Sequence, residues 1–172
     1  MRTETAVYPI YLTGLANRLA IVVGGGLVGT RKAGGLLAAG GRVRLISPQA
    51  TPTIQDWAAG GALEWLARPY QPGDLHGALL VFAATNQREV NAAVAQEAAG
   101  LGVLCNVADA PEEGNFHVPA LHRQVGLTIA VGSGGQSPTQ TKQMRDKIAE
   151  MLSQEGSGLA SQPESGIINP EI

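Results

Sequence analysis

The stretch that decides the fold is LAIVVGGGLVGTRK, residues 19–32. Its first five residues are a short, continuous apolar run, which is typical of a strand buried on both faces of a parallel sheet. Three glycines stop the run, and from Leu27 to Ala39 the leucines and alanines are spaced for one face of a helix. The stretch therefore predicts a strand, a tight glycine turn and a helix, which together open a β–α–β unit.

The glycine turn contains a GxGxxG motif made of Gly24, Gly26 and Gly29. In a dinucleotide site the first glycine makes the turn, the second lets the backbone approach a pyrophosphate, and the third brings helix and strand together. The N-terminus of the following helix favours the phosphate charge. A purely structural turn is the alternative in a chain with 23 glycines. The position of the motif directly after a first strand favours a dinucleotide site.

The alternation of strands and helices continues along the chain. Further strands are expected at 43–46, 63–66, 78–84 and 103–107, and further helices at 54–59 and 90–99. The pattern then changes: two extended segments, 115–119 and 127–131, flank a turn at 124–126 and are followed by a helix at 139–152. Strands that alternate with helices indicate an α/β fold with a parallel sheet.

The expected architecture is therefore a Rossmann-like parallel sheet with a short α+β dimerisation extension. Residues 1–112 would form the nucleotide-binding domain, and residues 113–152 an extension that forms a dimer and covers the substrate. Residues 153–172 are mostly Ser, Gly, Pro, Gln and Glu, a composition that predicts a disordered tail.

Composition excludes several classes of function. The 12 basic and 14 acidic residues are scattered and aromatic residues make up 4%, so we expect no nucleic-acid partner. Cys105 is the only cysteine and no Cys/His cluster has metal-ligand spacing, so we expect no disulfide and no protein-bound metal. No apolar run reaches the roughly 18 residues of a membrane helix. The N-terminal residues lack the pattern of a secretory signal, which predicts a cytoplasmic protein.

Polar residues follow three of the expected strands at the edge where open parallel sheets bind ligands. Thr85 and Asn86 follow one strand, and Asn106 and Asp109 lie at the end of another. Thr85 and Asn86 could instead cap the next helix, and Asp109 could be a turn-forming residue.

The end of the second expected strand carries Ser47, Pro48 and Gln49. An acidic residue usually stands here to bind the ribose hydroxyls of NAD, and Ser47 or Gln49 could form hydrogen bonds in its place. No arginine at this tip favours the 2′-phosphate of NADP, so NAD is the expected cofactor.

Other polar residues have less specific signals. His117 lies on an expected extended segment and could line the pocket, although a structural histidine is the alternative. Arg31 and Lys32 could belong to an anion-binding set or to a solvated charged face.

Five ordered blocks of the sequence resemble the siroheme synthase N-terminal family, the precorrin-2 dehydrogenase/sirohydrochlorin ferrochelatases. The blocks are GGGLVGTRK at 24–32, similar to the family's GGGxVAxRK; ATN at 84–86; CNVAD at 105–109, similar to CNVxD; Phe116 with Pro119 and Ala120, similar to FxxPA; and GGQSP at 134–138, similar to GGxSP. The resemblance covers about residues 8–152.

The resemblance implies a homodimer that uses NAD to oxidise precorrin-2 to sirohydrochlorin, which many members then convert to siroheme by inserting Fe²⁺. It implies that Asp109 is catalytic and that Ser133 lies near the tetrapyrrole. With the strand-end residues added, the expected cofactor site is Gly24, Gly25, Gly26, Leu27, Val28, Ser47, Pro48, Gln49, Thr85 and Asn86, and the expected substrate contacts are Asn106, His117, Ser133, Arg31 and Lys32. The alternatives are a non-catalytic NAD- or tetrapyrrole-binding regulatory module and an enzyme with chelatase activity alone.

Overall fold

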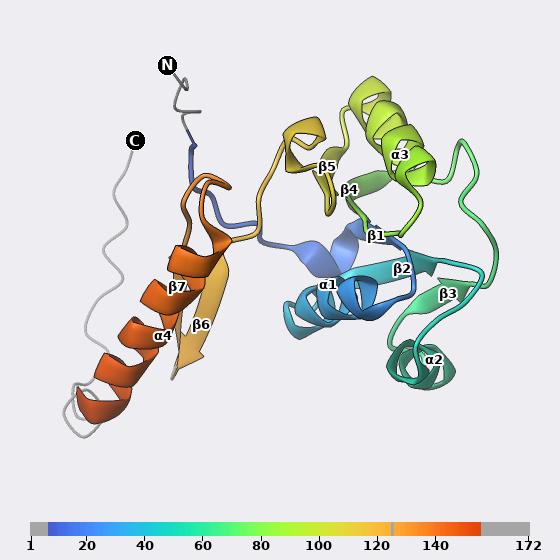
Figure 1. Cartoon of the computed structure of the whole chain (residues 1–172). Coiled ribbons are helices and arrows are strands. Elements are labelled where there is room, and N and C mark those ends of the chain that lie inside the picture. The colour runs from blue at the N-terminus through green and yellow to red at the C-terminus, as the bar shows by residue number, and fades with distance from the viewer. Residues whose placement is uncertain (1–6, 125, 156–172) are drawn as a thin grey trace, which may run out of the picture. The chain divides into compact units, whose positions relative to one another are not determined.

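A five-stranded parallel sheet forms the first part of the computed structural model, in the order β3-β2-β1-β4-β5 (Figure 1). The strands are β1 Leu19–Val23, β2 Arg42–Ile46, β3 Glu64–Leu66, β4 Ala78–Ala83 and β5 Leu104–Val107. The helices between them are α1 Leu27–Ala38, α2 Pro52–Ala59 and α3 Arg88–Leu101, with short 3-10 turns η1 at Leu15–Asn17 and η2 at Pro111–Glu113. The Rossmann-like α/β prediction is confirmed.

The structure describes residues 7–124 and 126–155. It divides into two compact units, of which unit 1 ends at His117 and unit 2 begins at Val118. Within the described residues, none of the helices has both the length and the apolar character needed to cross a membrane.

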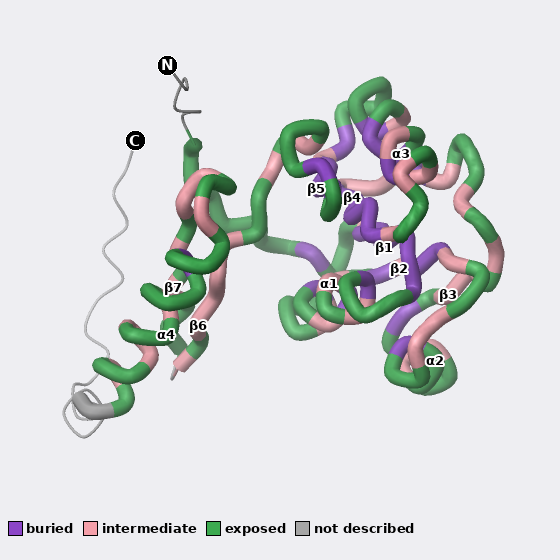
Figure 2. Tube along the Cα trace, viewed as in Figure 1, coloured by how far each residue is buried: buried purple, intermediate pink, exposed green. Residues whose placement is uncertain are grey.

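Two apolar layers pack on opposite faces of the sheet in unit 1. Ile21 and Val23 of β1 point to the layer that contains Val94 and Ala98 of α3. Ala20 and Val22 point to the other layer, which contains apolar side chains of α1 and α2. Buried residues therefore concentrate in the central strands, shown in purple in Figure 2. This two-faced burial explains why the strands are continuous apolar runs rather than alternating ones.

Unit 2 contains an antiparallel hairpin and one long helix. The strands are β6 Ala120–Gln124 and β7 Leu127–Val131, and the helix is α4 Pro138–Glu155. The extended segment expected at 115–119 does not pair with β7, because the strand that pairs with it starts at Ala120. Asn115 instead binds the edge of β5.

Other element boundaries differ by a few residues from the expected ones. The helix α2 begins at Pro52, where the fixed backbone angle of proline suits the first helical position. The helix α4 continues to Glu155 and so takes up the first three residues of the expected disordered tail. The rest of that tail, residues 156–172, lies outside the described residues.

The outer edge of β5 is closed by Asn115. Its backbone N–H donates to the carbonyl oxygen of Cys105 at 2.9 Å, and its side-chain oxygen accepts from the Cys105 N–H at 2.8 Å. Its side-chain amide also donates to the Val103 carbonyl at 3.4 Å. One residue thus occupies backbone groups that an edge strand would leave unpaired, and it turns the chain after β5 back along the sheet.

Replacing Asn115 with Ala removes the side-chain bonds and leaves the Cys105 N–H without its partner. We expect the free energy of unfolding to fall by about 1–3 kcal/mol, the usual effect of losing such a partner, measured by urea denaturation. Asn86→Ala, at an exposed position, is the matched control and should stay within about 0.5 kcal/mol of the wild type. Equal losses in the two variants would contradict a role of Asn115 at the edge.

Candidate functional site

The glycines of the turn after β1 are required for different reasons. Gly24 has a φ of +118°, and a Cβ there would overlap the carbonyl oxygen of Ala84 at the end of β4. A Cβ at Gly29 would overlap the carbonyl oxygen of Gly24, so the helix α1 approaches β1 at this point without any side chain between them. The turn is therefore built on close backbone approaches that no other residue type allows.

Gly26 differs from the other two glycines because open space surrounds it. A Cβ at Gly26 would meet no atom within 4 Å. Gly26 is the N-cap of α1, no side chain caps the helix, and the next side chain, that of Leu27, is 84% exposed. The start of α1 thus presents uncapped N–H groups to an open space, which is the arrangement that accepts a pyrophosphate. The turn fits a dinucleotide.

The loop after β2 packs against this turn. A Cβ at Gly25 would overlap the backbone of Gln49, and the Thr51 N–H donates to the Gly25 carbonyl at 3.0 Å. Ser47 is bound through its backbone to β3, because its carbonyl oxygen accepts from the Trp65 indole N–H at 2.9 Å. The side chains of Pro48 and Gln49 are exposed. The structure thus brings the expected residues of the β2 tip and the glycine turn together.

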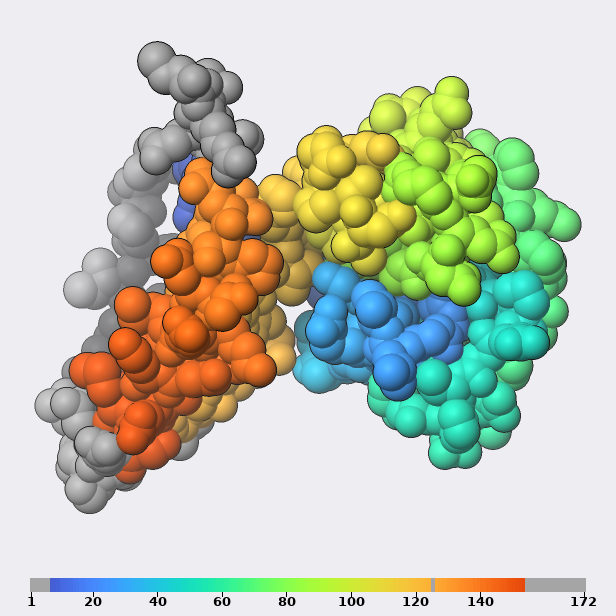
Figure 3. Space-filling model, in the orientation of Figure 1, coloured from blue at the N-terminus to red at the C-terminus, as the bar shows by residue number. Residues whose placement is uncertain are grey.

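The end of β4 lies on the other side of the turn. In the space-filling view, the blue atoms around the start of α1 border the cyan atoms of the loop after β2 and the yellow-green atoms of α3 (Figure 3). The backbone nitrogen of Thr85 lies close to Gly24. The interpretation of Thr85 and Asn86 as helix caps is wrong, because Gln87 is the N-cap of α3 and no side chain caps it. Thr85 instead binds a buried residue of α3.

That residue is Asn91, which is completely buried. Its side-chain oxygen accepts from the N–H of Thr85 at 3.1 Å and lies 2.8 Å from the Thr85 hydroxyl. Its amide nitrogen donates to the Thr85 carbonyl at 3.0 Å and to Oδ1 of Asp109 at 2.9 Å. Both acceptor positions and both hydrogens of the amide are therefore used. Asn91 links the wall of the glycine turn to Asp109.

Asp109 lies beyond the carboxyl end of β5, with 39% of its side chain exposed. Its Oδ1 also accepts from Nη1 of Arg88 at 3.0 Å, and Nη2 of Arg88 pairs with Glu113. The backbone bends at Ala108 and Asp109, and Pro111 offers the carboxylate no N–H. The carboxylate is held by α3.

The pKa of Asp109 lies below its usual value. Partial desolvation acts to raise the pKa, but the hydrogen bonds from Arg88 and Asn91, with the charge of Arg88, together outweigh it. The group is therefore ionised at neutral pH and can accept a proton.

Asn106 and Lys32 form a second contact on the other face of the sheet. Nζ of Lys32 donates to Oδ1 of Asn106 at 3.2 Å and lies 4.7 Å from the centre of the Phe82 ring. Asn106 donates to the carbonyl oxygen of Phe116 at 3.0 Å. Burial, with a smaller effect from Arg31, lowers the pKa of Lys32. The two residues are thus brought together, but in a half-buried contact with the sheet.

The other expected substrate contacts are not joined to Asp109. Arg31 and His117 are exposed in unit 1, and no hydrogen bond within the described ranges connects either of them to Asp109. Ser133 belongs to unit 2, where its hydroxyl oxygen accepts from the Ser137 N–H at 2.9 Å and from the Thr141 hydroxyl at 3.1 Å. Ser133 therefore orders the loop at the start of α4.

Sequence reasoning missed Arg88 and Asn91. Both lie at the start of α3, and both residue types are disfavoured at these positions of a helix. A cation in the first turn opposes the helix dipole, and asparagine is a weak helix former that is seldom fully buried. These two irregularities were the signal that could have identified them.

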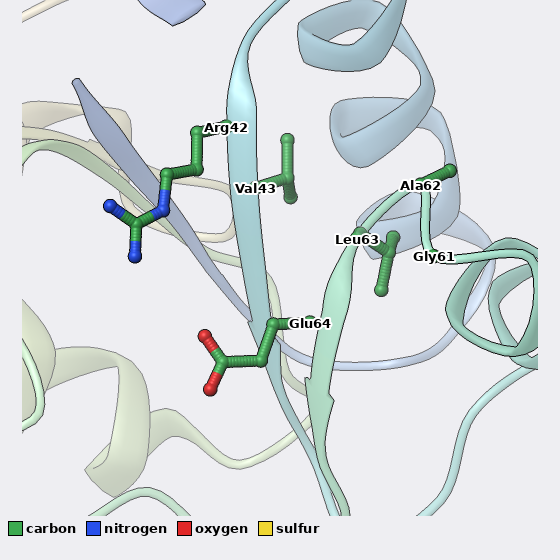
Figure 4. Close-up of a pocket in the computed structure, with 6 residues that line it drawn as sticks. All are labelled: Arg42, Val43, Gly61, Ala62, Leu63 and Glu64. Carbon is green, nitrogen blue, oxygen red and sulfur yellow. The ribbon is translucent and has the colours of Figure 1, made fainter. Parts of the chain in front are cut away.

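Each unit has a hollow in its surface. One is lined by Arg42, Val43, Gly61, Ala62, Leu63 and Glu64, at the amino ends of β2 and β3 and thus at the opposite end of the sheet (Figure 4). The other is in unit 2, beside Ser133, Thr141 and Lys147.

In the described part of the chain, no group of three or more His, Cys, Asp or Glu residues could hold a metal ion. Burial raises the pKa of the Cys105 thiol to about 11, which makes it a poor nucleophile.

Comparisons with known proteins match the same region. A family model described as "Putative NAD(P)-binding" matches residues 12–120. Siroheme synthase 1 of Aeromonas salmonicida is 40% identical over 140 residues, and the siroheme synthase of Methylobacillus flagellatus is 40% identical over 144 residues. These matches cover 81% and 84% of this chain, which spans about 30% of the length of those relatives.

The solved structure of SirC, precorrin-2 dehydrogenase, is also similar. Its TM-score is 0.72 at 28% sequence identity, over 84% of this chain and 71% of that chain. The matched family model spans the sheet, the glycine turn and Asp109. The chain therefore belongs to the siroheme synthase N-terminal family of NAD(P)-binding proteins.

Proposed function

We propose that this chain oxidises precorrin-2 to sirohydrochlorin with NAD⁺ as the electron acceptor. The observation that carries the proposal is the row of contacts from Gly24 through Thr85 and Asn91 to Asp109. It brings a dinucleotide turn and an ionised, accessible carboxylate to the same edge of one sheet. The similarity to SirC, precorrin-2 dehydrogenase, and to the siroheme synthases supports the choice of substrate.

The proposed chemistry divides between the cofactor and the chain. NAD⁺, when bound, takes a hydride from precorrin-2, and the reaction also releases one proton. The uncapped start of α1 binds the pyrophosphate, and Ser47 or Gln49 at the β2 tip binds the ribose. Asp109 takes the proton, since its carboxylate is ionised and partly exposed.

The other expected substrate residues stay proposals. Precorrin-2 carries several carboxylates, which suit the exposed cation of Arg31 and the ammonium of Lys32. Asn106, His117 and Ser133 are the remaining candidate contacts.

We also propose Fe²⁺ insertion as an optional second step, in which the tetrapyrrole nitrogens would supply the ligands. A cytoplasmic location is also part of the proposal.

We further propose that unit 2 pairs with a second copy of the chain. Thr141 is the only buried residue among residues 118–124 and 126–153. Leu127 is 55% exposed, Met144 51% and Met151 62%. A unit without a buried apolar core is not stable alone, because its helix and strands must bury their apolar faces against another layer. An identical unit would supply the missing cover.

Turnover is the direct test of the proposed function. Purified protein with precorrin-2 and NAD⁺ should form NADH and the absorption spectrum of sirohydrochlorin. Asp109→Asn keeps the shape of the side chain but cannot take the proton, and we expect kcat to fall about 10²- to 10⁴-fold with NAD⁺ affinity unchanged.

Each result of this assay has a distinct meaning. NAD⁺ binding without turnover by the wild type would contradict the dehydrogenase and favour a nucleotide-binding regulatory module. Metal insertion into sirohydrochlorin without any oxidation of precorrin-2, tested by adding Fe²⁺, would favour a chelatase alone. Full activity of Asp109→Asn would remove Asp109 from the mechanism.

Cofactor binding can be tested at Gly26. Gly26→Val adds a side chain in open space, so the fold should persist while the place of the pyrophosphate is filled. We expect the Kd for NAD⁺ to rise about 10-fold or more, which corresponds to roughly 1.4 kcal/mol, in a calorimetric titration. Gly35→Val, in the same helix and also without close neighbours, is the control and should bind like the wild type. Equal binding by Gly26→Val would contradict a pyrophosphate site at this turn.

The proposed dimer can be tested by its mass in solution. Light scattering after size exclusion should give twice the chain mass of 17.7 kDa at micromolar concentration. Replacing Leu127 and Met144 together by Glu should shift the protein toward the monomer, because charge on an apolar interface is costly. Arg42→Glu in unit 1 is the control and should stay dimeric. A monomeric wild type would refute this pairing.

A further inference from the structure

Asp109 is held from two sides through the same oxygen. The Asn91 amide reaches Oδ1 from the buried face of α3, at 2.9 Å, and the Arg88 guanidinium reaches it from the exposed face, at 3.0 Å. Within the described ranges, no side chain donates a hydrogen bond to Oδ2. The two oxygens of one carboxylate are thus unequal: two side chains hold Oδ1 and none holds Oδ2.

Each of the two donors is itself immobilised. The Asn91 amide has all of its hydrogen-bonding positions occupied, and the bonds to the Thr85 backbone determine which end of the amide faces Asp109. The Arg88 guanidinium is anchored at its other nitrogen by Glu113 on η2. A carboxylate bound by two restrained donors keeps one orientation, whereas an exposed aspartate on a loop would rotate freely.

Both donors are energetically unfavourable at their positions in α3. Arg88 is the first residue of α3, where its positive charge opposes the positive end of the helix dipole. Asn91 introduces an amide into an apolar layer, where any unpaired hydrogen-bonding group would be costly. Departures from local preference that converge on one side chain are expected at functional sites.

We propose that Arg88 and Asn91 are positioning residues that hold Oδ1 of Asp109, so that Oδ2 is the atom that takes the substrate proton. This inference rests on the proposed function, because it assigns a geometry to the proposed base. The charge of Arg88 also keeps the carboxylate ionised at acidic pH. The charged groups that face Asp109 are Arg88 on α3 and, through Arg88, Glu113 on η2.

The test compares Arg88→Ala with the wild type in two measurements. The first is the titration of the Asp109 carboxyl carbon by ¹³C NMR in the protein without substrate, assigned with Asp109→Asn. Removing the cation should move the pKa of Asp109 upward. The second is the pH dependence of kcat/KM, in which the apparent pKa of the acidic limb should rise together with the pKa of Asp109. We also expect kcat to fall about 10- to 100-fold, because the carboxylate loses its orientation.

Matched variants separate positioning from loss of structure. Arg42→Ala removes a cation at the opposite end of the sheet and should leave both measurements unchanged. Glu113→Gln removes an anion beside Arg88 and should not raise the pKa of Asp109. Arg88→Lys restores the charge without the planar fork, so it should recover the pH profile more fully than kcat.

An unchanged Asp109 titration in Arg88→Ala would overturn the inference. A shifted titration with an unchanged acidic limb and unchanged kcat would also overturn it, because Arg88 would then bind Asp109 without serving the reaction. Absence of turnover in the wild type, or full turnover in Asp109→Asn, is a different result: it would refute the proposed function whatever the titration showed.

Discussion

The close approach of α1 to β1 is the constraint on which the candidate site depends. It exists because Gly29 has no side chain, so the helix rests on the backbone carbonyl of Gly24. A larger residue would push α1 outward and separate its uncapped N–H groups from the ends of the neighbouring strands. The loop after β2 and the end of β4 both pack on the same turn, so their positions also follow from this contact.

The two faces of the sheet contribute differently to the site. The face covered by α1 provides the glycine turn and the half-buried contact of Lys32 with Asn106. The face covered by α3 provides Asn91, which reaches across to Asp109. The glycine turn therefore leads into α1, whereas the Asp109 carboxylate is held by α3. Thr85, which follows β4, links the two.

Much of this arrangement was predictable because it is local in the sequence. The run at 19–23 and the glycines after it indicate a strand and a turn by themselves, and a parallel sheet then brings Thr85 and Asp109 to the same edge. The contacts of Arg88 were not predictable, since its partners lie 21 and 25 residues away. The partner of the extended segment expected at 115–119 was not predictable either, because such a pattern does not determine which strand edge the segment binds: Asn115 binds β5 rather than β7.

The closed edge of β5 limits how copies of this protein can associate. Edge strands with free backbone groups invite strand-by-strand addition from other chains, both in useful assemblies and in aggregates. Asn115 occupies these groups with its own backbone and side chain, so the sheet ends there within the chain. Association through a continuous intermolecular sheet is blocked along β5, and contacts between side chains are left as the means of association on that flank.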